Sequence, residues 1–259
     1  GSDEESGSGD FKKHLESNEL PENVFVPDAC FPVGASETGR VVLEIRANPR
    51  LRFVTGIKSG KDGNSVPDSA EIEIKGVTET MIEAALAVVP SEVKTRAEAR
   101  GDGNFTVTLT GVSTHPAHPQ YGINAATAAI AFVSALEGDD AAFADLKRLF
   151  PHGAFFGEPF GLKPGSSTLS VVTLVLKNGG LYVETNSRFS PENTVAGISS
   201  ALISKLSSAS FDVKAVKCAE AHRVPKDAPI VETLQNIYRE RTGRRDEPYD
   251  LDAMTYAHL

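Results

Sequence analysis

Cysteine is scarce in this sequence. The 259 residues include only Cys30 and Cys218, which lie far apart and form no CxxC pair. A disulfide framework needs several paired thiols, and a cysteine-based zinc knot needs them at close spacing, so both are excluded. We therefore expect a protein of a reducing compartment, the cytoplasm.

Long apolar runs and an excess of positive charge are also missing. No apolar segment approaches the roughly 20 residues of a membrane-spanning helix, and the N-terminus lacks the basic-then-apolar layout of a secretory signal. Lysine and arginine total 26 against 35 acidic residues, a formal charge of -9. Binding to nucleic acid phosphates needs clustered positive charge. The expected partner is therefore a small molecule or a peptide, with no nucleic acid and no membrane.

The two ends of the sequence predict a fragment. The chain starts at Gly1 without an initiator methionine and stops at Leu259 within a segment that reads as ordinary folded protein. We therefore expect parts of the complete fold, and of any site in it, to lie outside these residues.

Apolar periodicity predicts an α+β fold. The expected strands are 51–57, 70–75, 105–109, 169–176, 180–186 and 211–216, and the expected helices are 78–89, 124–136, 143–150 and 194–206. The dipeptide Asn178-Gly179 indicates a hairpin turn. The repeated order of strand, helix and strand predicts an antiparallel sheet of two βαβ-type halves, with the helices on one face. Outside it we expect strands at 24–26 and 41–45, and helices at 10–19 and 230–242. We expect Thr78 to cap the start of helix 78–89 and Gly243 to cap the end of helix 230–242.

Carboxylates gather near the N-terminus. Asp3, Glu4 and Glu5 are consecutive, and Asp28 follows the apolar segment 24–26. Adjacent carboxylates repel one another unless a cation is near, and a divalent metal converts that repulsion into binding. Taken alone, the three acids could equally form a solvated end, and Asp28 could form a turn after Pro27.

Together with later segments, these residues resemble the M20 family of metallopeptidases, and within it the PepV-like dipeptidases. The further segments that carry the resemblance are Gly63-Asn64-Ser65-Val66-Pro67-Asp68-Ser69-Ala70, Gly111-Val112-Ser113-Thr114-His115, Pro119-Gln120-Tyr121-Gly122-Ile123-Asn124-Ala125, Ser187-Arg188-Phe189-Ser190-Pro191, Val224-Pro225-Lys226-Asp227 and Met254-Thr255-Tyr256-Ala257. They follow the order of the family through nearly the whole chain.

The resemblance implies a lid domain that covers the substrate, at residues 49–222. Residues 1–48 and 223–259 would then be pieces of an α/β zinc-peptidase catalytic domain. The family holds two Zn²⁺ ions and hydrolyses dipeptides or short peptides with a water that bridges them. Glu4 would be the general base, and Glu5 and Asp28 would each bind one zinc. The remaining ligands of the family, two histidines and a bridging aspartate, would lie outside this chain, so we expect the chain alone to be inactive.

Three lid residues receive roles from the same resemblance. His115 would stabilise the oxyanion, Arg188 would hold the terminal carboxylate of the substrate, and Asn64 would hydrogen-bond the substrate. Each residue also has an ordinary alternative. His115 could be a surface histidine, Arg188 could form a solvent-facing salt bridge, and Asn64 could shape a turn. His118 is a competing candidate for the role of His115.

Departures from the family keep other functions open. Asp252-Ala253 stands before Met254 and Thr255, where the family generally carries two glycines, so the dipeptide preference is in question. Deacylation of N-acyl amino acids uses the same chemistry and is one alternative. A non-catalytic binding or dimerisation module is another. A homodimer is one assembly that remains open.

Overall fold

The chain divides into two compact units, and each is described by itself. The computed structural model describes residues 9–19, 21, 23–27, 29–138, 140–163 and 165–255. Unit 1 comprises residues 1–39, 190–194 and 219–259, and unit 2 comprises residues 40–189 and 195–218. Three of the predicted site residues, Glu4, Glu5 and Asp28, lie outside the described residues.

An eight-stranded sheet forms the centre of unit 2. In spatial order its strands are β5 (Lys94–Gly101), β6 (Asn104–Thr110), β4 (Ser69–Ile74), β3 (Val54–Ser59), β7 (Ser167–Lys177), β8 (Gly180–Phe189), β2 (Gly39–Ala47) and β9 (Asp212–Ala219). Neighbours from β5 to β8 pair antiparallel. In β4 every second side chain is buried, which is the period of a strand with one covered face.

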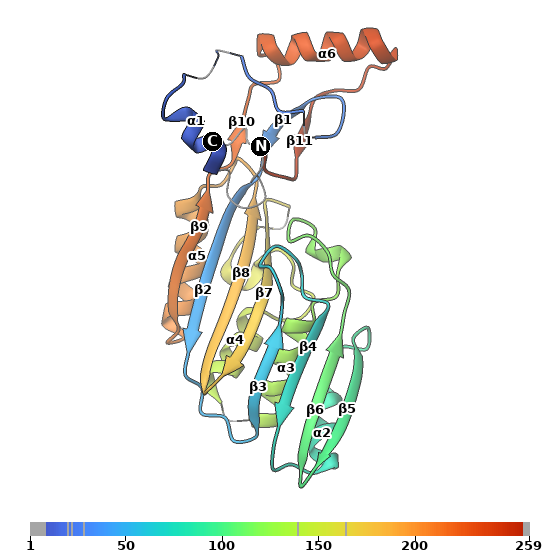
Figure 1. Cartoon of the computed structure of the whole chain (residues 1–259), viewed down its shortest axis with the longest axis vertical. Coiled ribbons are helices and arrows are strands. Elements are labelled where there is room, and N and C mark those ends of the chain that lie inside the picture. Colours follow the sequence, from blue (N-terminus) through green and yellow to red (C-terminus); the bar gives the residue numbers. More distant parts are fainter. Residues whose placement is uncertain are drawn as a thin grey trace. The chain divides into compact units, whose positions relative to one another are not determined.

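Helices cover one face of this sheet. They are α2 (Glu79–Leu86), α3 (Ala125–Glu137), α4 (Ala141–Leu149) and α5 (Val195–Ser208), and Figure 1 shows all four behind the strands. The chain passes twice through a strand, a helix and a strand, as β4–α2–β5 and as β8–α5–β9. The predicted α+β class, with an antiparallel sheet and helices on one face, is confirmed.

Helix α3 is fixed to the sheet at both ends. At its start, the Asn124 side chain accepts hydrogen bonds from the backbone N–H groups of Ala126 and Thr127, and it donates to the Val171 carbonyl of β7 at 2.8 Å. At its end, the Glu137 carboxylate is 1% exposed and accepts backbone N–H bonds from residues 52–54 at 2.7–2.8 Å. These charge-assisted bonds hold the entry to β3 against α3.

The hairpin of β7 and β8 turns where the sequence predicted. Asn178 and Gly179 have φ of 52° and 77°, and Lys177 pairs with Gly180 across the two-residue loop. Positive φ at both central residues gives the turn whose twist matches the flanking strands. This hairpin brings Ser170 and Asn186 opposite each other, and likewise Thr168 and Arg188.

The described residues of unit 1 form a three-stranded sheet and two helices. The strands β10 (His222–Arg223), β1 (Gly34–Glu37) and β11 (Tyr249–Leu251) lie in this order, with β1 antiparallel to β10 and parallel to β11. The helices are α1 (Gly9–Leu15) and α6 (Pro229–Thr242), and α6 ends at Gly243 with φ of 70°, as predicted. In the described part of the chain, no helix has the length and apolar character that crossing a membrane requires.

One predicted strand does not form, and another forms in a different place. Strand 41–45, which was expected outside the sheet, is β2 within the eight-stranded sheet. The described residues of the expected strand 24–26 have no regular structure, and the first strand begins only at Gly34. Conversely, β5 was not predicted, because all but one of its side chains are exposed and it shows no apolar alternation. The two compact units divide at 39/40 and 218/219. The predicted domain boundaries at 48/49 and 222/223, and the roles of lid and catalytic domain, stay predictions.

Candidate functional site

The remaining predicted site residues lie in unit 2, on three different elements. Asn64 lies in the β3–β4 loop (60–68), His115 lies in the β6–α3 loop (111–124), and Arg188 lies near the end of β8. The two loops are joined by a hydrogen bond from the Val66 N–H to the Thr114 carbonyl at 2.8 Å. Residues that are far apart in the sequence are thus brought to the same end of β8.

Alternation along β8 places Arg188 on the face opposite the buried core row. The odd-numbered residues 181–189 are buried, and the even-numbered residues 182–188 form the other row. In this second row, residues 182 and 184 are half-buried, and Asn186 and Arg188 are buried. The β3–β4 loop contacts the buried end, where the Asn186 side-chain amide donates to the Gly63 carbonyl at 3.1 Å.

Arg188 is a buried cation whose hydrogen-bond partners among the described residues are two amides. Its side chain donates from Nε to Asn186 Oδ1 at 3.1 Å and from Nη2 to Asn64 Oδ1 at 3.0 Å, and the residue is 5% exposed. No carboxylate among the described residues forms an ion pair with it. Burial, followed by the positive charge of Arg40, lowers the pKa of Arg188 to about 10, so the guanidinium stays charged at neutral pH.

The β3–β4 loop is shaped to present Asn64 to this cation. The Asp62 carboxylate accepts the backbone N–H of Asn64 at 2.9 Å and the hydroxyl of Ser65 at 2.8 Å, which forms an Asx turn. The Asn64 N–H is the main reason why the pKa of Asp62 is lowered. Gly60 has φ of +87°, and a Cβ there would lie 2.1 Å from the Val172 carbonyl oxygen. The loop can therefore approach the sheet only because this residue is glycine.

His115 is held in one tautomer by its own loop. Its Nδ1 accepts the backbone N–H of Ala117 at 3.2 Å, so in the neutral ring the proton lies on Nε2. Burial lowers the pKa of His115 from its ordinary value, and the positive charges of Arg188 and His118 lower it further. The competing candidate, His118, packs its ring against Tyr121 at 6.0 Å between centroids. His115 is thus a neutral Nε2–H donor near a buried cation.

We expect His115 to titrate below the ordinary histidine pKa of about 6.5. As the pH falls below that value, the unfolded chain takes up a proton at this residue before the folded chain does, so this contribution makes the folded state less stable. Arg188→Met removes the positive charge that helps to lower the pKa of His115. The pKa should therefore rise part of the way towards its ordinary value, because the burial of the ring remains. NMR titration of the imidazole proton measures both values, and an unchanged pKa in the variant would contradict the coupling.

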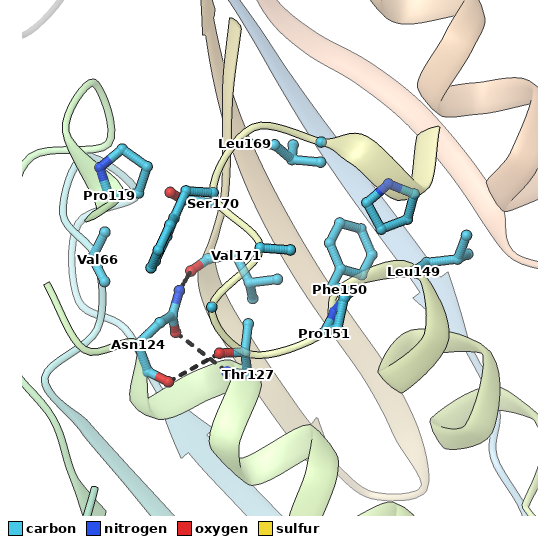
Figure 2. Close-up of a pocket in the computed structure, with 15 residues that line it drawn as sticks. Val66, Pro119, Asn124, Thr127, Leu149, Phe150, Pro151, Leu169, Ser170 and Val171 are labelled. Carbon is cyan, nitrogen blue, oxygen red and sulfur yellow. Dashed lines mark hydrogen bonds between the residues drawn. The ribbon is translucent and has the colours of Figure 1, made fainter. Parts of the chain in front are cut away.

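Asn64, His115 and Arg188 line neither of two hollows in unit 2. Figure 2 shows the first, between the start of α3, the loop after α4 and β7, lined by residues that include Val66, Asn124, Thr127 and Val171. Its internal volume of about 20 Å³ has room for about one water and is too small for a peptide. The second is an open surface hollow of about 660 Å³ near the end of β2, and none of the predicted site residues lines it.

The predicted metal ligands cannot be placed. Glu5 and Asp28 lie outside the described residues, as does the predicted base Glu4. Among the residues that are described, no three of histidine, cysteine, aspartate and glutamate gather in an arrangement that could hold a metal ion. The zinc site therefore stays a prediction from the sequence.

Sequence reasoning missed two residues of this region, Asn186 and Arg40. Asn186 lies two residues before Arg188, so the period of a strand could have placed both on one face. Arg40 gave no such signal, because its position beside Arg188 depends on β2 and β8 being neighbours in the sheet. Those strands are separated by more than 130 residues of sequence, so local patterns do not predict the pairing.

Comparison with known proteins finds relatives in the staphylococci. Over an alignment of 277 positions, the chain is 28% identical to a protein named "Putative dipeptidase" from Staphylococcus haemolyticus and 26% identical to one of the same name from Staphylococcus aureus strain USA300. Each alignment covers 99% of this chain and 58% of the relative, so the chain spans little more than half of their length. No protein-family model matches the chain.

Two solved structures show a weaker likeness. The aminoacylhistidine dipeptidase from Vibrio alginolyticus superposes with a TM-score of 0.38 and 10% identity, over 85% of this chain and 52% of that one. A tripeptidase from Staphylococcus aureus gives 0.36 and 7%, over 86% of this chain and 40% of that one. With TM-scores this low, neither structure adds to the argument about this chain.

Proposed function

We propose that this chain is part of an enzyme that hydrolyses dipeptides or short peptides, and that unit 2 binds the carboxylate end of the substrate. The observation that carries the proposal is the buried guanidinium of Arg188, which has two amide partners and no anionic partner among the described residues. A buried charge without a counter-ion is costly unless a ligand supplies one. The terminal carboxylate of a peptide matches the planar fork of a guanidinium.

In this proposal His115 contacts the scissile peptide bond of the substrate, whereas Arg188 binds its terminal carboxylate. A neutral imidazole with its proton on Nε2 donates a hydrogen bond to the carbonyl oxygen of the scissile bond, where negative charge develops. The lowered pKa of His115 keeps the ring in this neutral form at pH 7. Asn64 acts as a positioning residue, because its side-chain oxygen fixes the plane of the Arg188 guanidinium.

The names of the staphylococcal relatives support peptide hydrolysis as the reaction. The sequence resemblance adds two Zn²⁺ ions, with Glu5 and Asp28 as ligands and Glu4 as the base. Zinc, when bound, would polarise the carbonyl and lower the pKa of water. This part of the proposal rests on the sequence alone, as do the homodimer and the cytoplasmic location.

The test compares one dipeptide in two forms on the full-length protein that contains this chain. We expect Ala-Leu to be hydrolysed at least about 10²-fold faster than Ala-Leu amide, because the amide offers Arg188 no charge. N-acetyl-leucine keeps the same carboxylate, so faster hydrolysis of that compound would favour the deacylase. The 259-residue chain assayed alongside should be inactive, with less zinc per chain. Absence of all three hydrolyses in the full-length protein would favour the non-catalytic module.

A further inference from the structure

A second arginine, Arg40, lies in the same row of side chains as Arg188. On β2, the Arg46 guanidinium forms an ion pair with Glu44 at 3.1 Å and lies 5.1 Å from the ring centroid of Tyr182 on β8. The even-numbered residues of β2 therefore point to the same face as the even-numbered residues of β8. This alternation brings Arg40 onto the face of Arg188, and β2 and β8 are neighbours in the sheet.

Arg40 has no partner among the described residues. Its Nε is buried without any hydrogen bond, and no carboxylate of the described part forms an ion pair with it. Two carboxylates on nearby elements have other contacts. Asp62 accepts from Asn64 and Ser65, and Glu184 accepts the Tyr182 hydroxyl at 2.8 Å.

Two unpaired guanidiniums on one face of neighbouring strands repel each other. Like charges on adjacent strands are destabilising, and the burial of Arg188 beside the half-buried Arg40 strengthens the repulsion because less water screens it. The Arg40 charge also lowers the pKa of Arg188, so the two groups lie within electrostatic range. An anion bound at this face would offset the repulsion.

The number of unused donors fits two carboxylates rather than one. A guanidinium has five N–H groups, and Arg188 uses one from Nε and one from Nη2 on the two amides, which leaves three. Arg40 uses none on the described residues. One carboxylate occupies one guanidinium fork, so the second fork remains for another carboxylate of the same ligand.

We propose that Arg40 is a specificity-determining residue that binds a second carboxylate, so that the preferred substrates are dipeptides with a C-terminal aspartate or glutamate. This inference rests on the proposed function, in which Arg188 binds the terminal carboxylate. Arg40 then binds the side-chain carboxylate of the same residue. The face of β2 and β8 thus selects acidic C-terminal residues over neutral ones of the same size.

The experiment measures kcat/KM of the full-length protein for Ala-Glu and Ala-Gln, which differ only in the charge of one side chain. We expect a preference for Ala-Glu of about tenfold or more, because the neutral amide leaves the Arg40 charge unpaired. In Arg40→Gln the ratio should fall towards one. Arg46→Gln is the matched control, because Arg46 lies on the same strand and face with a side chain that is 58% exposed. It should leave the ratio unchanged.

Thermal unfolding without substrate separates recognition from a structural role. Arg40→Gln should unfold at the same temperature as the parent or higher, because it relieves the repulsion with Arg188, whereas a structural Arg40 would give a lower one. Arg40→Lys, which keeps the charge, should retain part of the preference. This inference alone would be overturned if the unsubstituted protein hydrolysed Ala-Glu and Ala-Gln with similar kcat/KM. It would also be overturned if Arg40→Gln kept the preference for Ala-Glu. Hydrolysis of neither peptide would overturn the proposed function as well.

Discussion

Replacing Arg188 with methionine in the full-length protein should reduce kcat/KM for Ala-Leu by about 10²-fold. The substitution removes a charge-assisted contact to the substrate carboxylate in a buried setting, which corresponds to about 2.7 kcal/mol of transition-state binding. Methionine fills a similar volume without a charge, so the sheet face keeps its packing. Arg188→Lys should give an intermediate loss, because an ammonium keeps the charge but not the two-pronged geometry.

A double-mutant cycle separates this contact from a general loss of structure. With Ala-Leu amide as substrate, Arg188→Met should change kcat/KM by less than about threefold, because the carboxylate is already absent. Arg46→Met removes an arginine from the same face, where the side chain is 58% exposed, and should leave both substrates unaffected. Equal losses on the acid and the amide would show that Arg188 supports the fold rather than the carboxylate.

Local chemistry made part of this fold predictable. Asn178-Gly179 predicted the hairpin because both residues tolerate positive φ, and both adopt it. Thr78 predicted the start of α2, and its side-chain oxygen accepts the Met81 N–H. Gly243 predicted the end of α6, where it adopts the left-handed conformation. Each of these predictions depends on a few adjacent residues, and sequence patterns are informative about structure over such short distances.

Features that depend on distant pairing were not predictable in the same way. β5 forms one edge of the sheet, and its exposed polar side chains carry no apolar period. The position of Arg40 depends on β2 lying beside β8, although the two strands are far apart in the chain. His115, Asn64 and Arg188 were found through family resemblance, which records such pairings indirectly. That resemblance gave no account of Asn186, whose side chain contacts both Arg188 and Gly63.

The predicted carboxylate site is a different case. Glu4, Glu5 and Asp28 all lie outside the described residues, so their roles stay predictions. In the proposed function, the residues near Arg188, which are two amides and a histidine, would contact the substrate, and the general base and the metal ligands would lie elsewhere. This division agrees with a substrate-binding unit that works together with a catalytic centre elsewhere in the full-length protein.

Gly60→Ala should detach the β3–β4 loop from the sheet. Gly60 has φ of +87°, and the added Cβ would lie 2.1 Å from the Val172 carbonyl oxygen, which is backbone and cannot turn away. The strain of the left-handed conformation costs about 1 kcal/mol, and the clash adds about 2 kcal/mol or forces the loop outward. A displaced loop would take the Asn64 oxygen from Arg188, so kcat/KM for Ala-Leu should fall about tenfold.

Gly101→Ala is a matched control for the strain alone. Gly101 has φ of +90°, almost the same as Gly60, but its added Cβ would meet nothing within 4 Å. Urea unfolding of the 259-residue chain should therefore show a loss of about 1 kcal/mol for Gly101→Ala and about 3 kcal/mol for Gly60→Ala. Amide hydrogen exchange should accelerate over residues 60–66 in Gly60→Ala and stay unchanged there in Gly101→Ala. Equal losses of stability, with no change in exchange, would mean that the loop does not depend on its close approach to Val172.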